Sequence, residues 1–370
     1  MSETDRNGAD ACPGTLQPHQ AADGPLARIR LPGGMISAAQ LDRLALTAAE
    51  FGDGSLQLTS RGNLQLRGLT SVPEVGAAVA EAGLLPAPSH ERVRNILASP
   101  LTGRVGGRSD LRPMVGELDM AIRSRPELAR LPGKFWFSLD DGTGDVAGFP
   151  ADAGARLVED GAALLLAGRD TGCRIAAGDV VPALVSIACR FAAARGTAWR
   201  VAELDDPGTL LGGFPAGQPS LPAAPAVRPP VGWITQDDGR VALGATVPLG
   251  VLSARQAQFI AAIAAPVVIT PWRSLLVCDL SEGVADTALR VLAPLGLVFD
   301  QASRWLEVSS CVGSPGCRRS RADVRADAVR EAERPGEGPV HFAGCERACG
   351  RPPAARVMIA ADGGYLPVVG

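Results

Sequence analysis

The sequence predicts an α+β fold in which one strand–helix unit occurs twice, and three observations lead to this prediction. Short runs of alternating apolar residues, typical of strands, are followed by Ala- and Leu-rich segments with helical spacing. Residues 21–86 resemble residues 231–300, and a proline-rich run over 215–230 precedes the second copy. Together they indicate a duplicated chain with pseudo-two-fold symmetry.

Composition narrows the class of protein. The 370 residues exceed one typical domain, and 46% hydrophobic residues with a mean hydropathy of +0.13 provide for a globular core. A net charge of −3 argues against a nucleic-acid partner. No apolar run approaches the roughly 20 residues of a membrane span, and the polar start MSETDRNGADACPG does not suit a signal peptide. We therefore expect a cytoplasmic protein without a membrane partner.

Each copy predicts strands alternating with helices. In the first copy LARIRLPGG is a strand and turn, Ser37 caps a helix, and LQLTSRGNLQLRGL follows. In the second copy the corresponding runs are VALGATVPLG, the cap Ser253, and VVITPWRSLLVCDL. Thr59 and Thr270 are equivalent in this alignment. The alternative is a chance similarity between two βαβ-like stretches.

The regions after each copy also mix strands and helices. After the first copy we expect helices at 111–124 and 181–194 and strands at 134–142, 161–168 and 173–178. After the second copy we expect strands at 305–311, 340–345 and 356–361. Between them, 318–333 is expected to form an amphipathic helix with Ala322, Val329 and Ala332 facing inward.

Four of the eight cysteines gather near the carboxyl end. They form a C-x5-C pair, Cys311 and Cys317, and a C-x3-C pair, Cys345 and Cys349. Both pairs lie in glycine-containing turns after a predicted strand, where backbone N–H groups can approach a buried anion. Four thiolates from two adjacent loops are what a 4Fe–4S cluster requires. A structural zinc and the absence of any metal are the alternatives. The usual C-x2-4-C spacing of zinc ligands suits Cys345 and Cys349 but not the C-x5-C pair.

Basic side chains recur on predicted strands. Arg28 and Arg30 alternate and so point to one face, while Ala242 and Gly244 replace them in our alignment of the second copy. A solvated face would not need one copy charged and the other apolar. The set predicts a site for a polycarboxylate; for any single arginine a solvated surface position is the alternative. The predicted binding residues are Arg28, Arg30, Arg61, Asn63, Arg67, Arg94 and Lys134.

These motifs together resemble the nitrite/sulfite reductase family over residues 21–370. They are RIRLPGG, TSRGNLQLRG, RNILASPLTG, LPGKF, C-x5-C and C-x3-C, in this order. The resemblance implies duplicated ferredoxin-like half domains packed with two α/β halves of the reductase type. It also implies that Arg28 or Arg30, Arg61, Arg94 and Lys134 hold the carboxylates of a tetrapyrrole. Cys349 matches the cysteine that bridges the cluster to the iron of sirohaem.

The resemblance also implies a division of the chain. The expected segments are a flexible tail (1–20), a first ferredoxin-like half (21–86), a central α/β half (87–214), a proline-rich linker (215–230), a second ferredoxin-like half (231–300) and a second central half with the cluster (301–370).

Some features depart from the sirohaem reductases. The chain is shorter, Trp136 stands where the family often has a second lysine, and 27 residues separate the cysteine pairs. These features look more like a branch of the family that oxygenates a tetrapyrrole in aerobic cobalamin biosynthesis. The resemblance then implies a monooxygenase in which a precorrin-3A-like substrate, O2 and external electrons react by C20 hydroxylation and ring-A lactone formation. Arg94 and Lys134 are the expected catalytic residues.

That branch implies a 4Fe–4S cluster and a mononuclear iron. The chain has three histidines, His19, His90 and His341, and no H-x-D/E motif, so the ligands of the iron stay unassigned. His341 is the candidate for a place near the cluster. GTGDVAG (142–148) lacks the strand–turn–helix context of an NAD site, so we expect a separate reductase or ferredoxin as electron donor. A sirohaem nitrite or sulfite reductase and a non-catalytic 4Fe–4S electron carrier are the alternatives.

Overall fold

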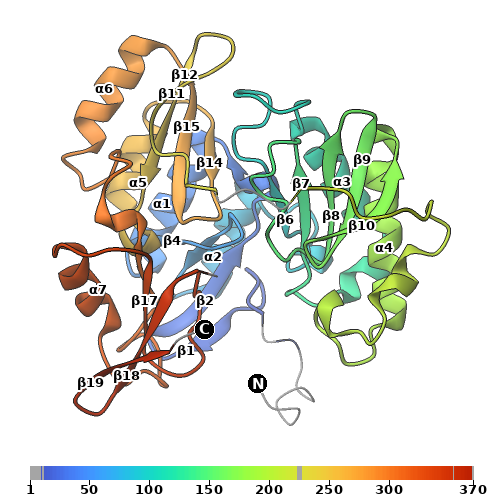
Figure 1. The fold of residues 1–370 in the computed structure, drawn as a ribbon. Helices are drawn as coiled ribbons and strands as arrows, with labels where there is room; N and C mark the ends of the chain where they lie inside the picture. Colours follow the sequence, from blue (N-terminus) through green and yellow to red (C-terminus); the bar gives the residue numbers. More distant parts are fainter. Residues whose placement is uncertain (1–9, 11, 223–226, 353, 369–370) are drawn as a thin grey trace.

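Three bodies make up the molecule in the computed structural model, which describes residue 10 and residues 12–222, 227–352 and 354–368 (Figure 1). A ferredoxin-like body contains two five-stranded antiparallel sheets. The first has the order β1 (His19–Ala21), β2 (Gly24–Ile29), β5 (Leu64–Leu66), β4 (Ser55–Leu58) and β13 (Val251–Ser253). The second has the order β11 (Gly232–Thr235), β12 (Val241–Thr246), β15 (Ser274–Leu280), β14 (Val267–Ile269) and β3 (Met35–Ile36).

The two ferredoxin-like halves exchange a strand. β13 comes from the second copy but pairs with β4 of the first, with Leu252 opposite Leu56. β3 comes from the first copy but pairs with β14 of the second, with Ile36 opposite Val267. Each sheet is therefore completed by the other copy, which fixes the two copies around their common axis.

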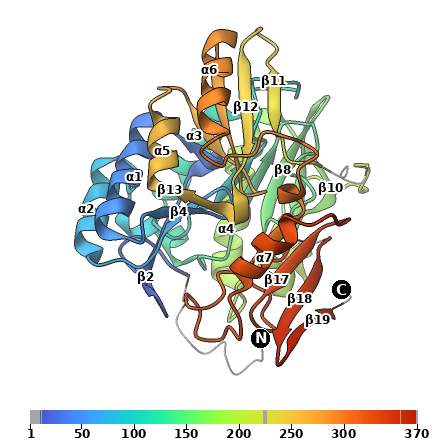
Figure 2. The same cartoon turned by 90° about the vertical axis from the view of Figure 1, so that its left-hand side faces the viewer.

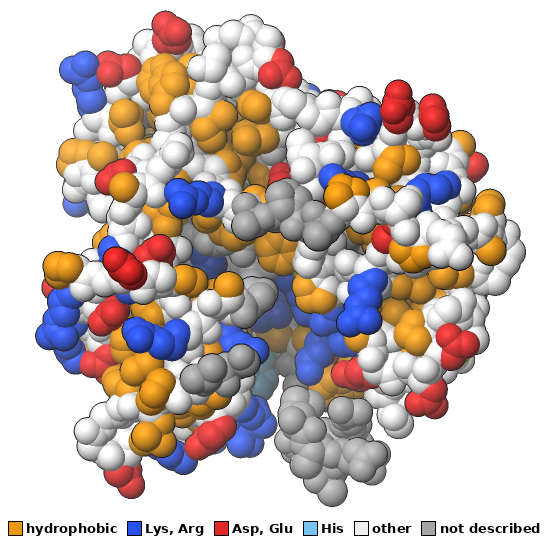
Figure 3. Space-filling model, in the orientation of Figure 1, with side chains coloured by type: hydrophobic (Ala, Val, Ile, Leu, Met, Phe, Trp, Pro, Cys, Tyr) orange, Lys and Arg blue, Asp and Glu red, His pale blue; other side chains and the backbone are white. Residues whose placement is uncertain are grey.

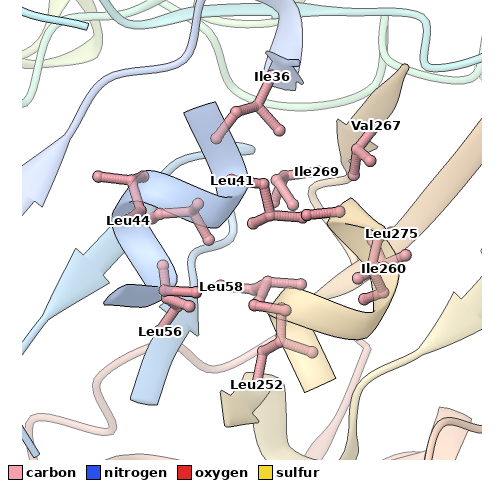
Figure 4. Packing of buried hydrophobic residues seen from close by; sticks show 14 of the residues in the cluster. Ile36, Leu41, Leu44, Leu56, Leu58, Leu252, Ile260, Val267, Ile269 and Leu275 are labelled. Atoms are coloured by element: carbon pink, nitrogen blue, oxygen red, sulfur yellow. The ribbon is translucent and has the colours of Figure 1, made fainter. Parts of the chain in front are cut away.

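Matching capping boxes start the equivalent helices of the two copies, as expected from the serines. Ser37 and Gln40 cap α1 (Ala38–Phe51), and Ser253 and Gln256 cap α5 (Ala254–Ala261). α1 packs against α5, and α2 (Val72–Glu81) and α6 (Glu282–Leu292) lie on the same side of the sheets (Figure 2). Figure 4 shows the joint core, with side chains of both copies interleaved.

The register of the repeat differs from the predicted alignment. Arg28 lies opposite Gln65, and Gly244 lies opposite Leu276, the counterpart of Gln65 when Thr59 is matched to Thr270. Gly244 is therefore the counterpart of Arg28, and Thr246 that of Arg30, two residues from the predicted positions. The loss of charge in the second copy remains, because neither counterpart is basic.

The first central half is a mixed five-stranded sheet covered by helices. Its order is β10 (Arg169–Ile175), β9 (Gly161–Leu166), β8 (Ala153–Val158), β7 (Phe137–Asp140) and β6 (Ile96–Ala98). The predicted helices are confirmed as α3 (Arg112–Arg123) and α4 (Val180–Ala194). By length and composition α4 could cross a membrane. Its side chains Leu184, Ile187 and Phe191 are instead buried in the core of this half.

The second central half is a small sheet with one helix. Its order is β16 (Val308–Ser310), β17 (Val340–Ala343), β18 (Arg356–Ala361) and β19 (Gly364–Val368), with parallel pairing from β16 to β18. The helix α7 spans Val324–Ala332 and buries Val324 and Ala328. The expected helix over 318–333 thus begins six residues late, because residues 318–323 continue the loop that carries Cys317. Ala322 and Ala332 pack at the edge of this core.

The described part of the expected tail contacts the rest of the chain. The backbone N–H groups of Thr15, Leu16 and Gln17 donate to the Glu91 carboxylate, the first at 2.6 Å. β1 then pairs with β2. Residues 1–9 and 11 of the predicted tail lie outside the described residues.

Candidate functional site

The two cysteine pairs follow two neighbouring parallel strands. Cys311 comes directly after β16, and Cys345 comes two residues after the end of β17. The Gly344 N–H donates to the Cys311 sulfur at 3.3 Å. Burial raises the pKa of the Cys349 thiol, and the neighbouring Cys311, Cys345 and Cys317 raise it further. The fold thus brings all four predicted ligands to one edge of the sheet.

The spread of the sulfurs suits a cluster better than a single ion. A tetrahedral zinc with Zn–S bonds of about 2.3 Å brings its sulfurs to within about 3.8 Å of one another. Among the described residues, no three of these sulfurs lie within 4.8 Å of one another. The quartet is therefore more open than a zinc site, and a 4Fe–4S cluster is an inorganic group that takes four thiolates at a wider spacing.

A cavity of about 710 Å³ lies beside the cysteines, at the junction of the three bodies. Cys311 and Cys349 form part of its wall. Figure 3 shows basic side chains gathered in the hollow at the centre of this face. Asp10 is the one acid among the described lining residues, so the cavity is strongly cationic. Its basic residues are Arg28, Arg61, Arg67, Lys134, Arg273, Arg325 and Arg347.

Three of the predicted cations have neutral partners and form no ion pair with a described residue. Arg28 donates from Nε to the side-chain oxygen of Gln65 at 2.9 Å. The Arg61 guanidinium lies 5.3 Å from the centre of the Trp136 ring, and the Lys134 ammonium lies 4.1 Å from that of Trp199. Burial, followed by the charges of neighbouring arginines, lowers the pKa of Arg61 to about 10.

Two further predicted residues, Arg67 and Asn63, form hydrogen bonds to other groups of the protein. Arg67 forms a bidentate ion pair with Asp23, and its Nη2 also donates to the Gly316 carbonyl at 3.1 Å. It thereby ties the first cysteine loop to the ferredoxin-like body. Asn63 accepts from the Leu31 N–H at 2.8 Å and donates to Asn95. Both residues line the cavity, but Arg67 Nε and Nη2 and the Asn63 side-chain amide already bind groups of the protein.

Arg30 is buried behind the cavity wall. It is 2% exposed, and its Nη2 donates to the carbonyl of Pro13, which itself lines the cavity. Its Nε and Nη1 have no hydrogen-bond partner among the described residues. Burial, and then the nearby charge of Arg28, lower the pKa of Arg30. Of the pair Arg28 and Arg30, the structure thus gives Arg28 the direct access to the cavity.

Arg94 is not a cavity residue, which corrects its predicted catalytic and binding role. Its Nε and Nη2 donate to the two oxygens of Asp119 at 2.6 and 3.2 Å, and its Nη1 donates to the Leu84 carbonyl. The side chain is 5% exposed and is absent from the described lining. Its guanidinium is instead paired with the Asp119 carboxylate.

The prediction missed several lining residues. Arg273 lies in the second copy, Arg325 on α7 and Trp199 in the loop after α4. Cys12, from the predicted tail, also faces the cavity. Only the run of basic residues after Cys317 offered a sequence signal for Arg325, because each of these residues reaches the cavity through tertiary packing.

The three histidines do not form an iron site at the cavity. His19 is exposed on β1, and both ring nitrogens of His90 are engaged, by Ser89 and by the Arg125 carbonyl. His341 is fully buried, and burial lowers its pKa to about 4, with the nearby Arg273 charge as the second cause. None of the three histidines lines the cavity, so no two of them converge there with a carboxylate.

The GTGDVAG loop, which lacks the context of a dinucleotide site, folds around a carboxylate of the chain. Asp140 accepts backbone N–H groups from Gly142, Gly144, Val146 and Ala147. A separate hollow of about 880 Å³ lies beside β3 and β14, but none of the cysteines or predicted binding residues lines it. We therefore place the candidate site at the cationic cavity.

Comparisons with known proteins agree with this architecture. Residues 18–82 and 227–295 match the family described as nitrite/sulfite reductase ferredoxin-like half domain. The structure of the Mycobacterium tuberculosis NirA protein superposes with a TM-score of 0.78 at 20% identity, covering 99% of this chain and 80% of that one. This chain therefore shares the fold of the NirA protein over nearly its whole length, and the two matched segments agree with the duplication predicted from the sequence.

Individual relatives differ in how much of the chain they match. A protein named precorrin-3B synthase from Sinorhizobium sp is 29% identical over 97% of this chain and 82% of its own length. The ferredoxin–nitrite reductase of Synechococcus elongatus is 34% identical, but over 32% of this chain and 25% of its own. A second such enzyme, from Leptolyngbya laminosa, is 32% identical over 36% of this chain. The match to the reductases therefore covers about a third of this chain, whereas the match to the synthase covers nearly all of it.

Proposed function

We propose that this chain is a precorrin-3B synthase, an oxidoreductase that oxygenates a tetrapyrrole. The observation that carries the proposal is one cavity that joins unneutralised cations to two of the four clustered cysteines. The nearly full-length similarity to a protein of that name supports it. The substrate is precorrin-3A, which gains one oxygen atom of O2 as the C20 hydroxyl and forms a lactone from the ring-A acetate. The other oxygen atom leaves as water, with two electrons and two protons from a separate donor.

The cationic residues bind and orient this substrate. Precorrin-3A carries eight carboxylates, and charge-assisted hydrogen bonds from guanidinium groups hold carboxylates in fixed directions. Arg28 and Arg61 approach from the first ferredoxin-like half, and Lys134 from the first central half. Hydrogen bonds from cations of two different bodies fix the orientation of the macrocycle. Trp199 covers the Lys134 ammonium and so holds the side chain in place, and no described residue accepts a hydrogen bond from its N–H groups.

The cysteines fit a 4Fe–4S cluster, which when bound would supply single electrons at the edge of the cavity. The fit rests on the two Gly-containing loops at the ends of β16 and β17, and on the Gly344 N–H aimed at the Cys311 sulfur. Cys317 and Cys345 complete the set. A cytoplasmic setting, in which thiols stay reduced, suits this ligand set.

The proposal is tested with protein purified without oxygen. We expect about four irons per chain, a broad absorption near 400 nm without the strong red band of sirohaem, and turnover of precorrin-3A with ¹⁸O2 to a product that carries one ¹⁸O atom. Cys345→Ser should lose the 400 nm absorption and the irons, whereas Cys189→Ser, on α4, should keep both. A red sirohaem band and reduction of nitrite or sulfite would instead identify a reductase.

The single lysine of the chain gives a selective test of the binding site. Lys134 is the one lysine in the sequence, so an amine-specific reagent can modify only this side chain and the N-terminus. We expect uroporphyrin, a macrocycle with eight carboxylates, to slow the modification of Lys134 but not that of the N-terminal amine. Equal rates with and without uroporphyrin would remove Lys134 from the site.

A further inference from the structure

Arg273 has a left-handed backbone conformation, and the equivalent position in the first copy is a glycine. Its φ is +58°, in the left-handed region, and it lies in the loop between β14 and β15. Matching Thr59 to Thr270 places it opposite Gly62, whose φ is +66°. A residue with a Cβ loses about 1–2 kcal/mol in this conformation. Residues held in such conformations concentrate at functional sites.

The side chain of Arg273 spans from the cavity to the last cysteine. It lines the cavity, and its Nη2 donates to the Gly350 carbonyl at 2.7 Å, directly after Cys349. The φ of +81° at Gly350 favours glycine, and a Cβ there would meet Arg273 Nη2. The strained backbone thus aims the guanidinium at the loop of the proposed cluster.

Arg67 offers an internal comparison. Arg67, from the first copy, donates to the carbonyl of Gly316, the residue directly before Cys317. Arg273, from the second copy, donates to the carbonyl of Gly350, the residue directly after Cys349. Arg67, however, is neutralised by a bidentate pair with Asp23. No carboxylate of the described residues forms an ion pair with Arg273, and the nearby charge of Arg325 is also positive. Each arginine donates to the backbone of one cysteine loop, but Arg67 is paired with Asp23 whereas Arg273 forms no ion pair with a described residue.

We propose that Arg273 is a positioning residue that couples occupancy of the cavity to the electron affinity of the cysteine site. Its Nη2 holds the Cys349 loop, and its uncompensated charge favours the state with one more electron. This inference rests on the proposed function, because it assumes a 4Fe–4S cluster on the four cysteines. On a cluster held by these cysteines, the added electron would come from an external one-electron donor, from the 2+ to the 1+ state, with no proton transferred.

Two consequences follow from the electrostatics. A nearby positive charge stabilises the more negative, reduced cluster, so it raises the midpoint potential. A polycarboxylate bound beside Arg273 offsets this charge and so lowers the potential. By linkage, reduction of the cluster then weakens binding of the same polycarboxylate by the same factor.

Arg273→Gly tests the role, since glycine adopts the left-handed backbone without strain. We expect the variant to keep about four irons and a Tm equal to or above that of the unmodified protein. We also expect its midpoint potential, measured by a dithionite titration followed by EPR, to fall. Its affinity for uroporphyrin should decrease about tenfold, as for the loss of one charge-assisted hydrogen bond. Uroporphyrin should shift the potential less in the variant than in the unmodified protein.

Matched variants separate charge from backbone. Ala264 is exposed, has φ +58° and does not line the cavity, so Ala264→Gly relieves the same strain and should leave the potential unchanged. Arg273→Lys keeps the charge and should retain a potential close to that of the unmodified protein. Arg273→Gln keeps a donor for the Gly350 carbonyl but removes the charge, and should reproduce the lower potential with four irons.

The outcomes distinguish this inference from the proposed function. If the unmodified protein binds no four-iron cluster, the proposed function fails. If the cluster forms but Arg273→Gly and Arg273→Gln show unchanged potentials and unchanged uroporphyrin affinity, only the coupling role is overturned. A lower Tm with an unchanged potential in all three Arg273 variants would likewise make Arg273 a purely structural residue.

Discussion

At the scale of single residues, the partner of each buried cation separates binding from structure. Arg28, Arg61 and Lys134 lie against an amide or an indole ring, so their charges remain available to a ligand. Arg94 and Arg104 instead each donate to both carboxylate oxygens of an aspartate that lies elsewhere in the sequence. Those pairs stabilise the fold. Because both charges are buried and already paired, they are not available to bind a ligand.

Arg94→Ala should therefore destabilise the protein more than it affects binding. Removing one partner leaves the Asp119 carboxylate buried with a weaker partner, Arg123, which typically costs about 3–5 kcal/mol for a buried pair. Urea denaturation measures this loss. Arg290→Ala, at an exposed pair on α6, is the control and should change the free energy of unfolding by less than about 1 kcal/mol. If Arg94→Ala left the free energy of unfolding unchanged but weakened uroporphyrin binding, Arg94 would be a binding residue.

A pH dependence of stability should arise from Asp145. Burial, followed by the charges of Asp140 and Asp141, raises its pKa to about 7, while Ser99 donates to it at 2.6 Å. An acid with a raised pKa in the folded state stabilises the fold least at high pH. Between about pH 4 and pH 7 the unfolded chain ionises first, so this group removes up to about 1.4 kcal/mol of stability for each pH unit.

Asp145→Asn provides the check on this pH dependence. The amide keeps an oxygen that can accept from Ser99 but cannot ionise. Urea denaturation of both proteins at pH 5 and pH 7 should show a smaller loss of stability in the variant. If both proteins lose the same stability over this interval, another group is responsible.

At the scale of elements, reciprocal strand exchange positions the cavity. β3 and β13 each leave their own copy through a Pro-x-Gly turn, at residues 32–34 and 248–250. Leu249 and Gly250, in the second of these turns, line the cavity. The crossing that joins the two sheets thus also forms part of the binding wall, so the shape of the cavity depends on both copies.

Gly34→Ala should disrupt this crossing. Gly34 has φ +71°, and a Cβ there would meet the Ile269 carbonyl oxygen of β14. We expect a loss of more than about 2 kcal/mol in the free energy of unfolding, from backbone strain and the steric conflict together. Gly54→Ala is the matched control, because its φ is +77° but no atom lies within 4 Å of the added Cβ. Equal losses in the two variants would show that the β3–β14 approach is not tight.

At the scale of the whole molecule, charge is distributed unevenly. The net charge is −3, yet the cavity collects seven basic residues and one acidic residue among its described lining. Three bodies contribute to it, so the concentration of charge exists only when they are assembled. A concave cationic surface attracts anions over distances of about a Debye length, roughly 10 Å at 0.1 M salt.

Binding of polycarboxylates should accordingly weaken with salt and with fewer carboxylates. We expect the dissociation constant for uroporphyrin, measured by fluorescence quenching, to rise steadily as salt is increased from about 0.05 to 0.5 M. Coproporphyrin, with four carboxylates, should bind more weakly and with a smaller salt dependence. A dissociation constant that does not change with salt would contradict electrostatic binding of the macrocycle.

The sequence by itself determined the duplication, the capped helices and the cysteine quartet. These follow from local rules, because a serine cap needs only Gln three residues on, and the cysteine turns follow short apolar strands at fixed spacings. The tertiary structure alone decided which cations face the cavity. Arg94 and Arg61 look alike in the sequence, but Asp119 neutralises one and Trp136 flanks the other. Arg273 could not be foreseen at all, because its role depends on where a loop of the second copy meets Gly350. Local spacing fixes elements, whereas the availability of a charge depends on partners that only packing brings together.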